Sequence, residues 1–186
     1  MKKVLIIHGF EGTPNGGWRP WLMGELEKID IYACSLAMPE PAAPVCDDWL
    51  AEIGRHVERD PEDEIYLVGH SLGSPAILRY LELSDKTTNI KGVVLVSCPS
   101  EKNGNAKIDG FLEAPFMFKM IRTRAKRFAV IHGDDDPLVP LANGEAIAKS
   151  LGCPLTVIPG GQHLNGSSGF WTLPECLQIL LKMFTA

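Results

Sequence analysis

Short apolar runs recur along the chain and alternate with longer segments in which apolar residues recur every three or four positions. The runs have the length of strands, and continuous apolarity is typical of strands covered on both faces of a parallel sheet. The longer segments have the spacing of helices that bury one face. The predicted strands span residues 4–7, 31–34, 64–68, 92–96, 127–131 and 155–158.

A segment with helical spacing follows most of these strands. Ile29 and Leu181 are included in the apolar faces of the first and last segments. Between residues 97 and 126 the alternation breaks, and residues 111–121 have two interpretations: their aromatic and methionine side chains cover a binding site, or they form an amphipathic helix that fills the edge of the sheet. The predicted helices span about residues 18–29, 49–57, 72–83, 141–151 and 173–184.

The alternation of strands and helices predicts an α/β fold, a three-layer α/β/α sandwich around a mostly parallel sheet of about six strands. A βα unit takes about 30 residues. The 186 residues are therefore expected to form a single domain, residues 1–186. Ligands bind such sheets beyond the carboxyl ends of the strands, so the loops that follow strands are where functional residues are expected.

Composition and charge narrow the classes of function. The net charge of -5 argues against nucleic acid or an anionic membrane as a partner. The five cysteines are scattered without Cys-x-x-Cys spacing, which argues against a disulfide framework or a zinc site and favours a reducing cytoplasm. The first apolar run stops at His8-Gly9, which is too early for a secretory signal or a membrane span.

The third predicted strand runs directly into Gly69-His70-Ser71-Leu72-Gly73, and a predicted helix follows. Gly-x-Ser-x-Gly between a strand and a helix is the pattern of a nucleophile elbow, a sharp turn that exposes a serine hydroxyl above the sheet. The motif is short and arises often by chance. A catalytic Ser71 therefore also requires a base to take its proton and an acid to orient that base.

Candidates for both partners follow Ser71 in the order acid, then histidine. His163 lies in a glycine-rich loop after the last strand and is the expected base, and the alternative is an ordinary exposed loop histidine. Three consecutive aspartates follow the fifth strand. Asp136 is the preferred acid because the sequence after it predicts a turn into the next helix. Asp134 is the second choice, and Asp135 is expected to be solvated.

An oxyanion hole is expected from the backbone N–H groups of Leu72 and Phe10. His8-Gly9-Phe10 is alternatively an ordinary turn at the end of a strand. No metal site is expected, because no second carboxylate cluster accompanies the aspartates. The chemistry needs no cofactor. Cys98 also ends a strand near this edge, and a packing role is expected for it.

With these residues assembled, the chain resembles the α/β-hydrolase superfamily and, more narrowly, the small YdeN-type serine hydrolases, a family that includes a retinoblastoma-binding protein. The resemblance covers nearly the whole chain. It rests on His8-Gly9-Phe10 with Trp18 and Trp21, Gly69 to Gly73, Asp136 to Pro140, His163 to Asn165, Gly169-Phe170 and Pro174-Glu175.

The resemblance implies a minimal α/β-hydrolase fold without a large lid domain, with Ser71, Asp136 and His163 as the catalytic triad. The chain departs from the family at Gln162, where a glycine usually precedes the histidine. It also lacks the Leu-x-Cys-x-Glu motif linked to retinoblastoma-protein binding, so that partner is not carried over.

The sequence therefore predicts a cytoplasmic, carboxylesterase-like serine hydrolase that cleaves small ester or related acyl substrates through an acyl-enzyme. The expected partner is a small-molecule substrate, with no nucleic acid and no membrane, and the sequence does not identify a protein partner. The alternative is a non-catalytic binding or scaffold protein, because a fold alone does not define a function. A complete triad in the right order favours the enzyme.

Overall fold

Parallel strands form one central sheet in the computed structural model, which describes residues 1–84 and 89–185. The sheet has six strands in the order β2-β1-β3-β4-β5-β6, and all neighbours pair in parallel. The predicted strands are confirmed, with ends that shift by up to two residues. The strands are β1 (Lys2–Ile7), β2 (Tyr32–Ser35), β3 (Glu64–His70), β4 (Ile90–Val96), β5 (Phe128–Gly133) and β6 (Leu155–Ile158).

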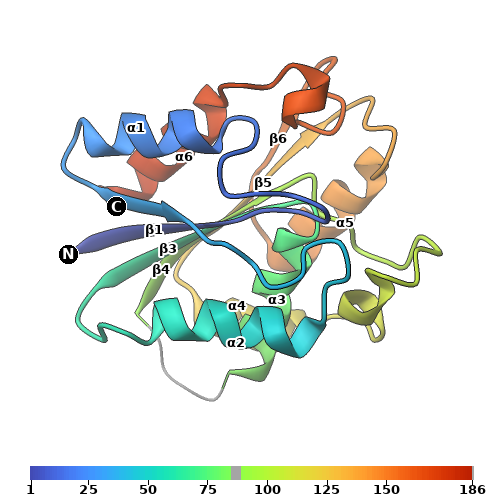
Figure 1. Cartoon of the computed structure of the whole chain (residues 1–186), viewed down its shortest axis with the longest axis horizontal. Helices are drawn as coiled ribbons and strands as arrows, with labels where there is room; N and C mark the ends of the chain where they lie inside the picture. The colour runs from blue at the N-terminus through green and yellow to red at the C-terminus, as the bar shows by residue number, and fades with distance from the viewer. Residues whose placement is uncertain (85–88, 186) are drawn as a thin grey trace.

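Helices cover both faces of the sheet, as Figure 1 shows. On one face lie α1 (Arg19–Glu27) and α6 (Pro174–Phe184). On the other lie α2 (Cys46–Val57), α3 (Gly73–Leu83), α4 (Phe118–Arg124) and α5 (Leu141–Leu151). Short 3-10 turns, η1 (Asp109–Leu112) and η2 (Gly166–Ser168), lie in connecting loops. The predicted three-layer α/β/α architecture is confirmed.

Each face of the sheet has its own core, because successive residues of a strand point to opposite faces. In β3, Leu67 packs into the core under α2 and α3, and Val68 packs into the core under α1 and α6. The prediction that Ile29 and Leu181 lie on buried apolar faces was wrong. Ile29 lies beyond the end of α1 and is 47% exposed, and Leu181 is 39% exposed. Met183 is buried on α6 in its place.

The four buried side chains of residues 111–121 pack into the core at the edge of the molecule, the others are at least partly exposed, and the segment leaves the carboxyl ends of the strands uncovered. Phe111 and Phe116 are buried in the core under α2 and α3. The buried Arg79 of α3 donates a hydrogen bond to the carbonyl oxygen of Phe111, and its guanidinium carbon lies 4.2 Å from the centroid of the Phe116 ring. The packing interpretation of this segment is therefore correct, and no large lid covers the described part of the sheet.

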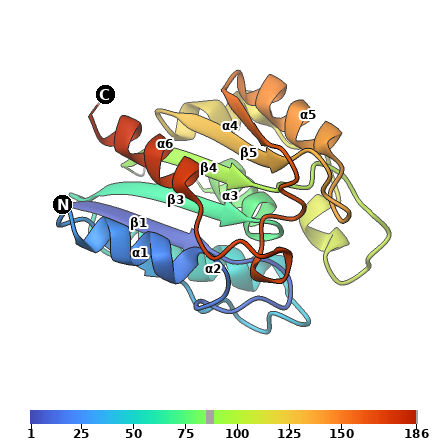
Figure 2. The same cartoon turned by 90° about the horizontal axis from the view of Figure 1, so that it is seen from above.

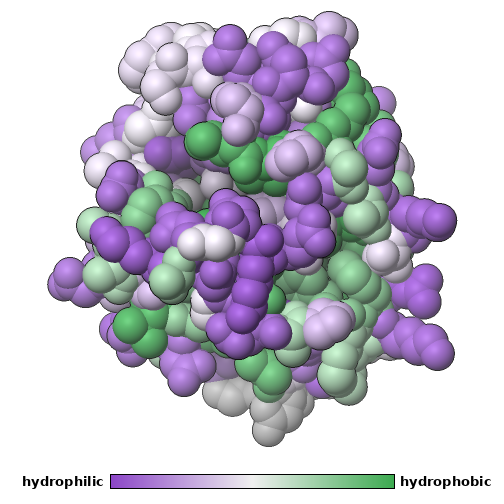
Figure 3. Space-filling model, turned by 90° about the vertical axis from the view of Figure 1, so that its right-hand side faces the viewer, coloured by the Kyte–Doolittle hydropathy of each residue, from purple (hydrophilic) through white to green (hydrophobic). Residues whose placement is uncertain are grey.

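The loops that follow the strands gather at one end of the molecule. Both chain termini lie at the opposite end, where the strands begin, as Figure 2 shows. Figure 3 faces the end where the strands finish: polar residues cover most of it, and apolar residues are exposed in a band above its centre. None of the described helices is long and apolar enough to cross a membrane.

Candidate active site

Ser71 lies in the turn between β3 and α3 with a φ of 51°. This left-handed conformation is strained for a residue with a side chain and persists only where the surroundings impose it. A β-carbon on Gly73 would lie 2.2 Å from the carbonyl oxygen of Ile7, and one on Gly69 would lie 2.7 Å from the Cα of Ser74. Both positions therefore require glycine for α3 to start this close to the sheet, and the segment has the geometry of a nucleophile elbow.

Asp136 and His163, which are far apart in the sequence, meet at the same edge of the sheet. His163 Nδ1 lies 2.8 Å from Asp136 Oδ2, and both residues are buried. A carboxylate can only accept, so Nδ1 carries the proton and Nε2 keeps a free lone pair. Burial alone would raise the pKa of Asp136, but the hydrogen bonds from His163 and from the backbone N–H groups of Val139 and Leu138 outweigh it and lower that pKa.

The two other aspartates of the cluster hold the loop that carries the histidine. Asp134 Oδ1 accepts from the N–H of Gly160 at 2.8 Å, and Asp135 Oδ1 accepts from the N–H of Gln162 at 2.7 Å. A β-carbon on Gly133 would lie 2.2 Å from the carbonyl oxygen of Gln162, so this loop lies directly against the end of β5. The structure thus brings Asp136 to the histidine, while Asp134 and Asp135, although exposed, bind the backbone beside it.

Two further side chains hold the same loop from the other side. His70 Nε2 donates to the carbonyl oxygen of His163 at 2.9 Å, and Trp18 Nε1 donates to that of Leu164 at 2.8 Å. Burial, followed by the neighbouring His163 and Arg19, lowers the pKa of His70 to about 3, so this ring is neutral at physiological pH. His70, the residue before Ser71, is therefore a buried support of this loop.

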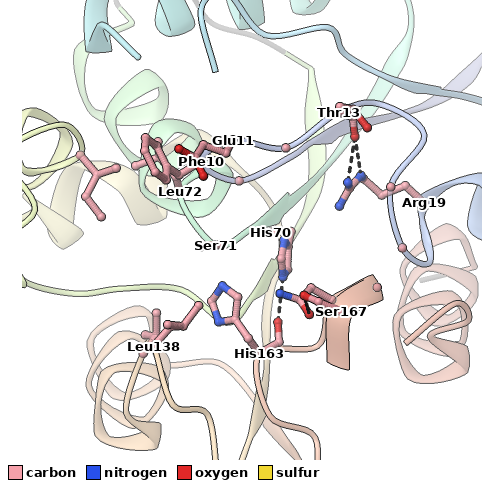
Figure 4. Close-up of a pocket in the computed structure, with 18 of the residues that line it drawn as sticks. Phe10, Glu11, Thr13, Arg19, His70, Ser71, Leu72, Leu138, His163 and Ser167 are labelled. Atoms are coloured by element: carbon pink, nitrogen blue, oxygen red, sulfur yellow. Dashed lines mark hydrogen bonds between the residues drawn. The ribbon is translucent and has the colours of Figure 1, made fainter. Parts of the chain in front are cut away.

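Ser71, His163, Phe10 and Leu72 line one cavity of about 710 Å³, which Figure 4 shows in close-up. This volume lies within the range of about 300–1,000 Å³ that is usual for small-molecule sites. Within residues 1–84 and 89–185, the N–H groups of Phe10 and Leu72 donate no hydrogen bond. They are therefore available to an oxygen atom bound beside Ser71.

Three other residues at or just after the ends of strands are buried. His8 is buried, and its Nδ1 lies 2.8 Å from the carbonyl oxygen of Gly9. His132 is fully buried and donates from Nε2 to the carbonyl oxygen of Val139 at 2.8 Å. Cys98 is fully buried, and burial raises the pKa of its thiol. In the described part of the chain, no cluster of three or more potential metal ligands occurs.

Arg19 lines the same cavity and was not identified from the sequence. It begins α1, is only 5% exposed, and donates from Nε and Nη2 to the carbonyl oxygen of Thr13 at 3.2 and 2.8 Å. Burial lowers the pKa of its guanidinium to about 10. Basic residues at helix starts are usually solvated, so no local pattern distinguishes this one.

The fold is that of the α/β-hydrolases, and the residues gathered around Ser71 suit a hydrolase with a serine nucleophile. The model of the serine hydrolase family matches residues 4–182, and the chain belongs to that family. The protein YdeN of Bacillus subtilis (strain 168) is 33% identical over 185 residues, which cover 99% of this chain and 97% of YdeN. The serine hydrolase RBBP9 of Rattus norvegicus is 24% identical over 188 residues, which cover 98% of this chain and 96% of RBBP9.

Solved structures show the same fold. The crystal structure of the B. subtilis ydeN gene product matches with a TM-score of 0.94 and 33% identity over 100% of both chains. Est1E from Butyrivibrio proteoclasticus matches with a TM-score of 0.78 and 18% identity, over 100% of this chain and 89% of that chain. The predicted resemblance to the YdeN-type hydrolases is confirmed.

Proposed function

We propose that this hydrolase cleaves small esters or related acyl compounds, with Ser71 as nucleophile, His163 as general base and Asp136 as the residue that orients His163. The observation that carries the proposal is the 2.8 Å hydrogen bond between His163 Nδ1 and Asp136 Oδ2, beside a cavity that Ser71 also lines. This bond leaves Nε2 as the proton acceptor, which is the tautomer that a serine nucleophile requires.

In the proposed reaction, the Ser71 hydroxyl oxygen attacks the acyl carbon while His163 Nε2 takes the hydroxyl proton. The negative charge that develops on the carbonyl oxygen is stabilised by the N–H groups of Leu72 and Phe10. Collapse of the tetrahedral intermediate expels the alcohol, which leaves with the proton from His163, and the acyl group stays on Ser71. A water molecule, deprotonated by His163, then releases the acid and restores the serine.

The test combines labelling by a fluorophosphonate probe with hydrolysis of 4-nitrophenyl butyrate. The native protein is compared with Ser71→Ala and His163→Ala, and Ser150→Ala and His56→Ala serve as matched controls outside the cavity. Loss of a triad member lowers the rate by about 10⁴- to 10⁶-fold, so both variants should lose labelling and turnover. The controls should match the native protein, and circular dichroism verifies that every variant is folded.

Two results would contradict the proposal. Undiminished labelling of Ser71→Ala would place the nucleophile elsewhere. A folded native protein that neither labels nor hydrolyses the ester would favour the alternative of a binding protein that has kept the hydrolase fold.

A further inference from the structure

The Arg19 guanidinium is a buried cation without an acidic partner on the wall of the cavity. Its hydrogen bonds all go to one acceptor, the carbonyl oxygen of Thr13. Within the described residues, no carboxylate forms a salt bridge with it. Figure 4 shows the side chain extending from the start of α1 toward Thr13 and the interior of the cavity.

This arrangement is unusual, because a buried charge is unfavourable unless a countercharge accompanies it. The other buried arginine of the chain, Arg79, has such a partner in the buried Glu82. Arg19 has none, yet its guanidinium stays protonated at neutral pH because its pKa, although lowered by burial, is still about 10. The guanidinium therefore carries a permanent positive charge that forms no ion pair with any carboxylate of the described residues.

The packing around Arg19 leaves room for its guanidinium on the cavity wall. A β-carbon on Gly16 would lie 2.5 Å from Arg19 Nη2, so the absence of a side chain at that position makes room for the guanidinium. Nε and Nη2 face Thr13, which leaves Nη1 without a hydrogen-bond partner among the described residues. A guanidinium is a planar fork of donors that matches a carboxylate.

We propose that Arg19 binds a carboxylate group of the substrate, so that the preferred substrates are esters that carry a free carboxylate in addition to the scissile bond. The inference rests on the proposed function, because it assigns a substrate class to the same cavity. The described lining of the cavity contains no lysine and no arginine other than Arg19. Its single positive charge matches the single negative charge of a carboxylate and would leave half of the charge of a phosphate dianion uncompensated.

Glu11 also lines the cavity and bears the opposite charge, but its position differs. Glu11 is exposed, whereas Arg19 is 5% exposed. Solvent screens an exposed charge much more than a buried one. Glu11 should therefore weaken the attraction for an anion only modestly, and Glu11→Gln should raise the preference for carboxylate-bearing esters.

The test compares matched esters that differ by one carboxylate. The first pair places it on the acyl side, as the 4-nitrophenyl monoester of adipic acid against 4-nitrophenyl hexanoate. The second pair places it on the leaving group, as the hexanoate ester of 4-hydroxybenzoate against that of 4-hydroxybenzamide. In one of the pairs, the native protein should favour the anionic ester by about 10- to 100-fold in kcat/KM, mainly through KM, which corresponds to about 1.4–2.7 kcal/mol.

Variants separate substrate binding from a merely structural role. Arg19→Met should lower kcat/KM by about 10- to 100-fold more for the anionic ester than for its neutral partner, and Arg19→Lys should retain part of the preference. Gly16→Ala should lower the preference by displacing the guanidinium. Arg55→Met is the control, because it makes the same charge change on an exposed face of α2.

The outcomes distinguish this inference from the proposed function. The fluorophosphonate probe bears no carboxylate, so labelling of Arg19→Met reports whether Ser71 is still reactive, independently of the anion site. If the native protein is labelled and hydrolyses neutral esters but shows no preference for the anionic ester in either pair, the substrate class alone is overturned. An equal loss of kcat/KM for both members of a pair in Arg19→Met would overturn it as well. If the protein hydrolyses no ester, its melting temperature is measured with adipate and with adipamide. Stabilisation by adipate alone that is lost in Arg19→Met supports the anion site. The absence of this stabilisation from the native protein overturns the anion site.

Discussion

Acidification should destabilise this protein through His70. The ring is 5% exposed, donates to the carbonyl oxygen of His163 and meets the edge of Trp18 at a centroid distance of 6.0 Å. Its pKa is about 3 in the native state against 6.5 for an unperturbed histidine. Between these two values the unfolded chain holds a proton that the native state does not, so the free energy of unfolding rises with pH across this window.

The size of the effect follows from the width of the window. The contribution of neutral His70 is complete above its unfolded pKa and is lost progressively as the pH falls below 6.5. Each pH unit inside the window corresponds to about 1.4 kcal/mol. At pH 5 the protein is about 1.5 units into the window, so His70 alone should lower the free energy of unfolding by about 2 kcal/mol relative to neutral pH.

Urea unfolding at pH 7 and pH 5 measures this loss in the native protein and in His70→Gln, whose amide keeps a donor near the position of Nε2. The native protein should lose about 2 kcal/mol more than the variant between the two pH values. Burial also lowers the pKa of His8, but that contribution is common to both proteins and cancels in the difference. Equal losses in the native protein and His70→Gln would refute the reasoning.

Three substitutions test the surroundings of the proposed triad. Asp136→Asn should lower kcat for 4-nitrophenyl butyrate by about 10⁴-fold, because an amide no longer enforces the histidine tautomer. Gly133→Ala should lower the free energy of unfolding by about 1–3 kcal/mol, measured in urea, because its β-carbon would meet the backbone of Gln162. Gln162→Gly should raise that free energy by up to about 1 kcal/mol, because Gln162 has a φ of 45°.

Each of these expectations has its own control. Asp134→Asn leaves the Asp136–His163 contact in place, so an equal loss of kcat in both asparagine variants would remove the distinction between the aspartates. Gly24→Ala introduces a β-carbon with no atom within 4 Å and should stabilise α1 by about 0.5–1 kcal/mol. A similar destabilisation by Gly24→Ala and Gly133→Ala, or a loss of stability in Gln162→Gly, would contradict the packing and strain arguments.

The sequence by itself determined the fold class and most of its elements, because these follow from local periodicity. Continuous apolar runs become strands that are buried on both faces in the centre of the sheet and partly exposed at its edges, in β2 and β6. The α5 and β6 boundaries match the prediction to the residue. The elbow was also a local property, since Gly69 and Gly73 frame Ser71 within one turn. Local periodicity failed at Ile29 and Leu181, because it does not reveal where a helix ends or how wide its buried face is.

Only the tertiary structure decided which side chains meet across long stretches of chain. The sequence ranked the three adjacent aspartates only by the turn expected after Asp136, and the loop after β6 separates their roles by presenting His163 to one and backbone N–H groups to the others. The buried side chains of residues 111–121 joined the core beside Arg79 of α3, which binds the carbonyl oxygen of Phe111. Arg19 became part of the cavity through the packing of α1 against loops distant in sequence. These contacts depend on how separate elements pack, which no local pattern encodes.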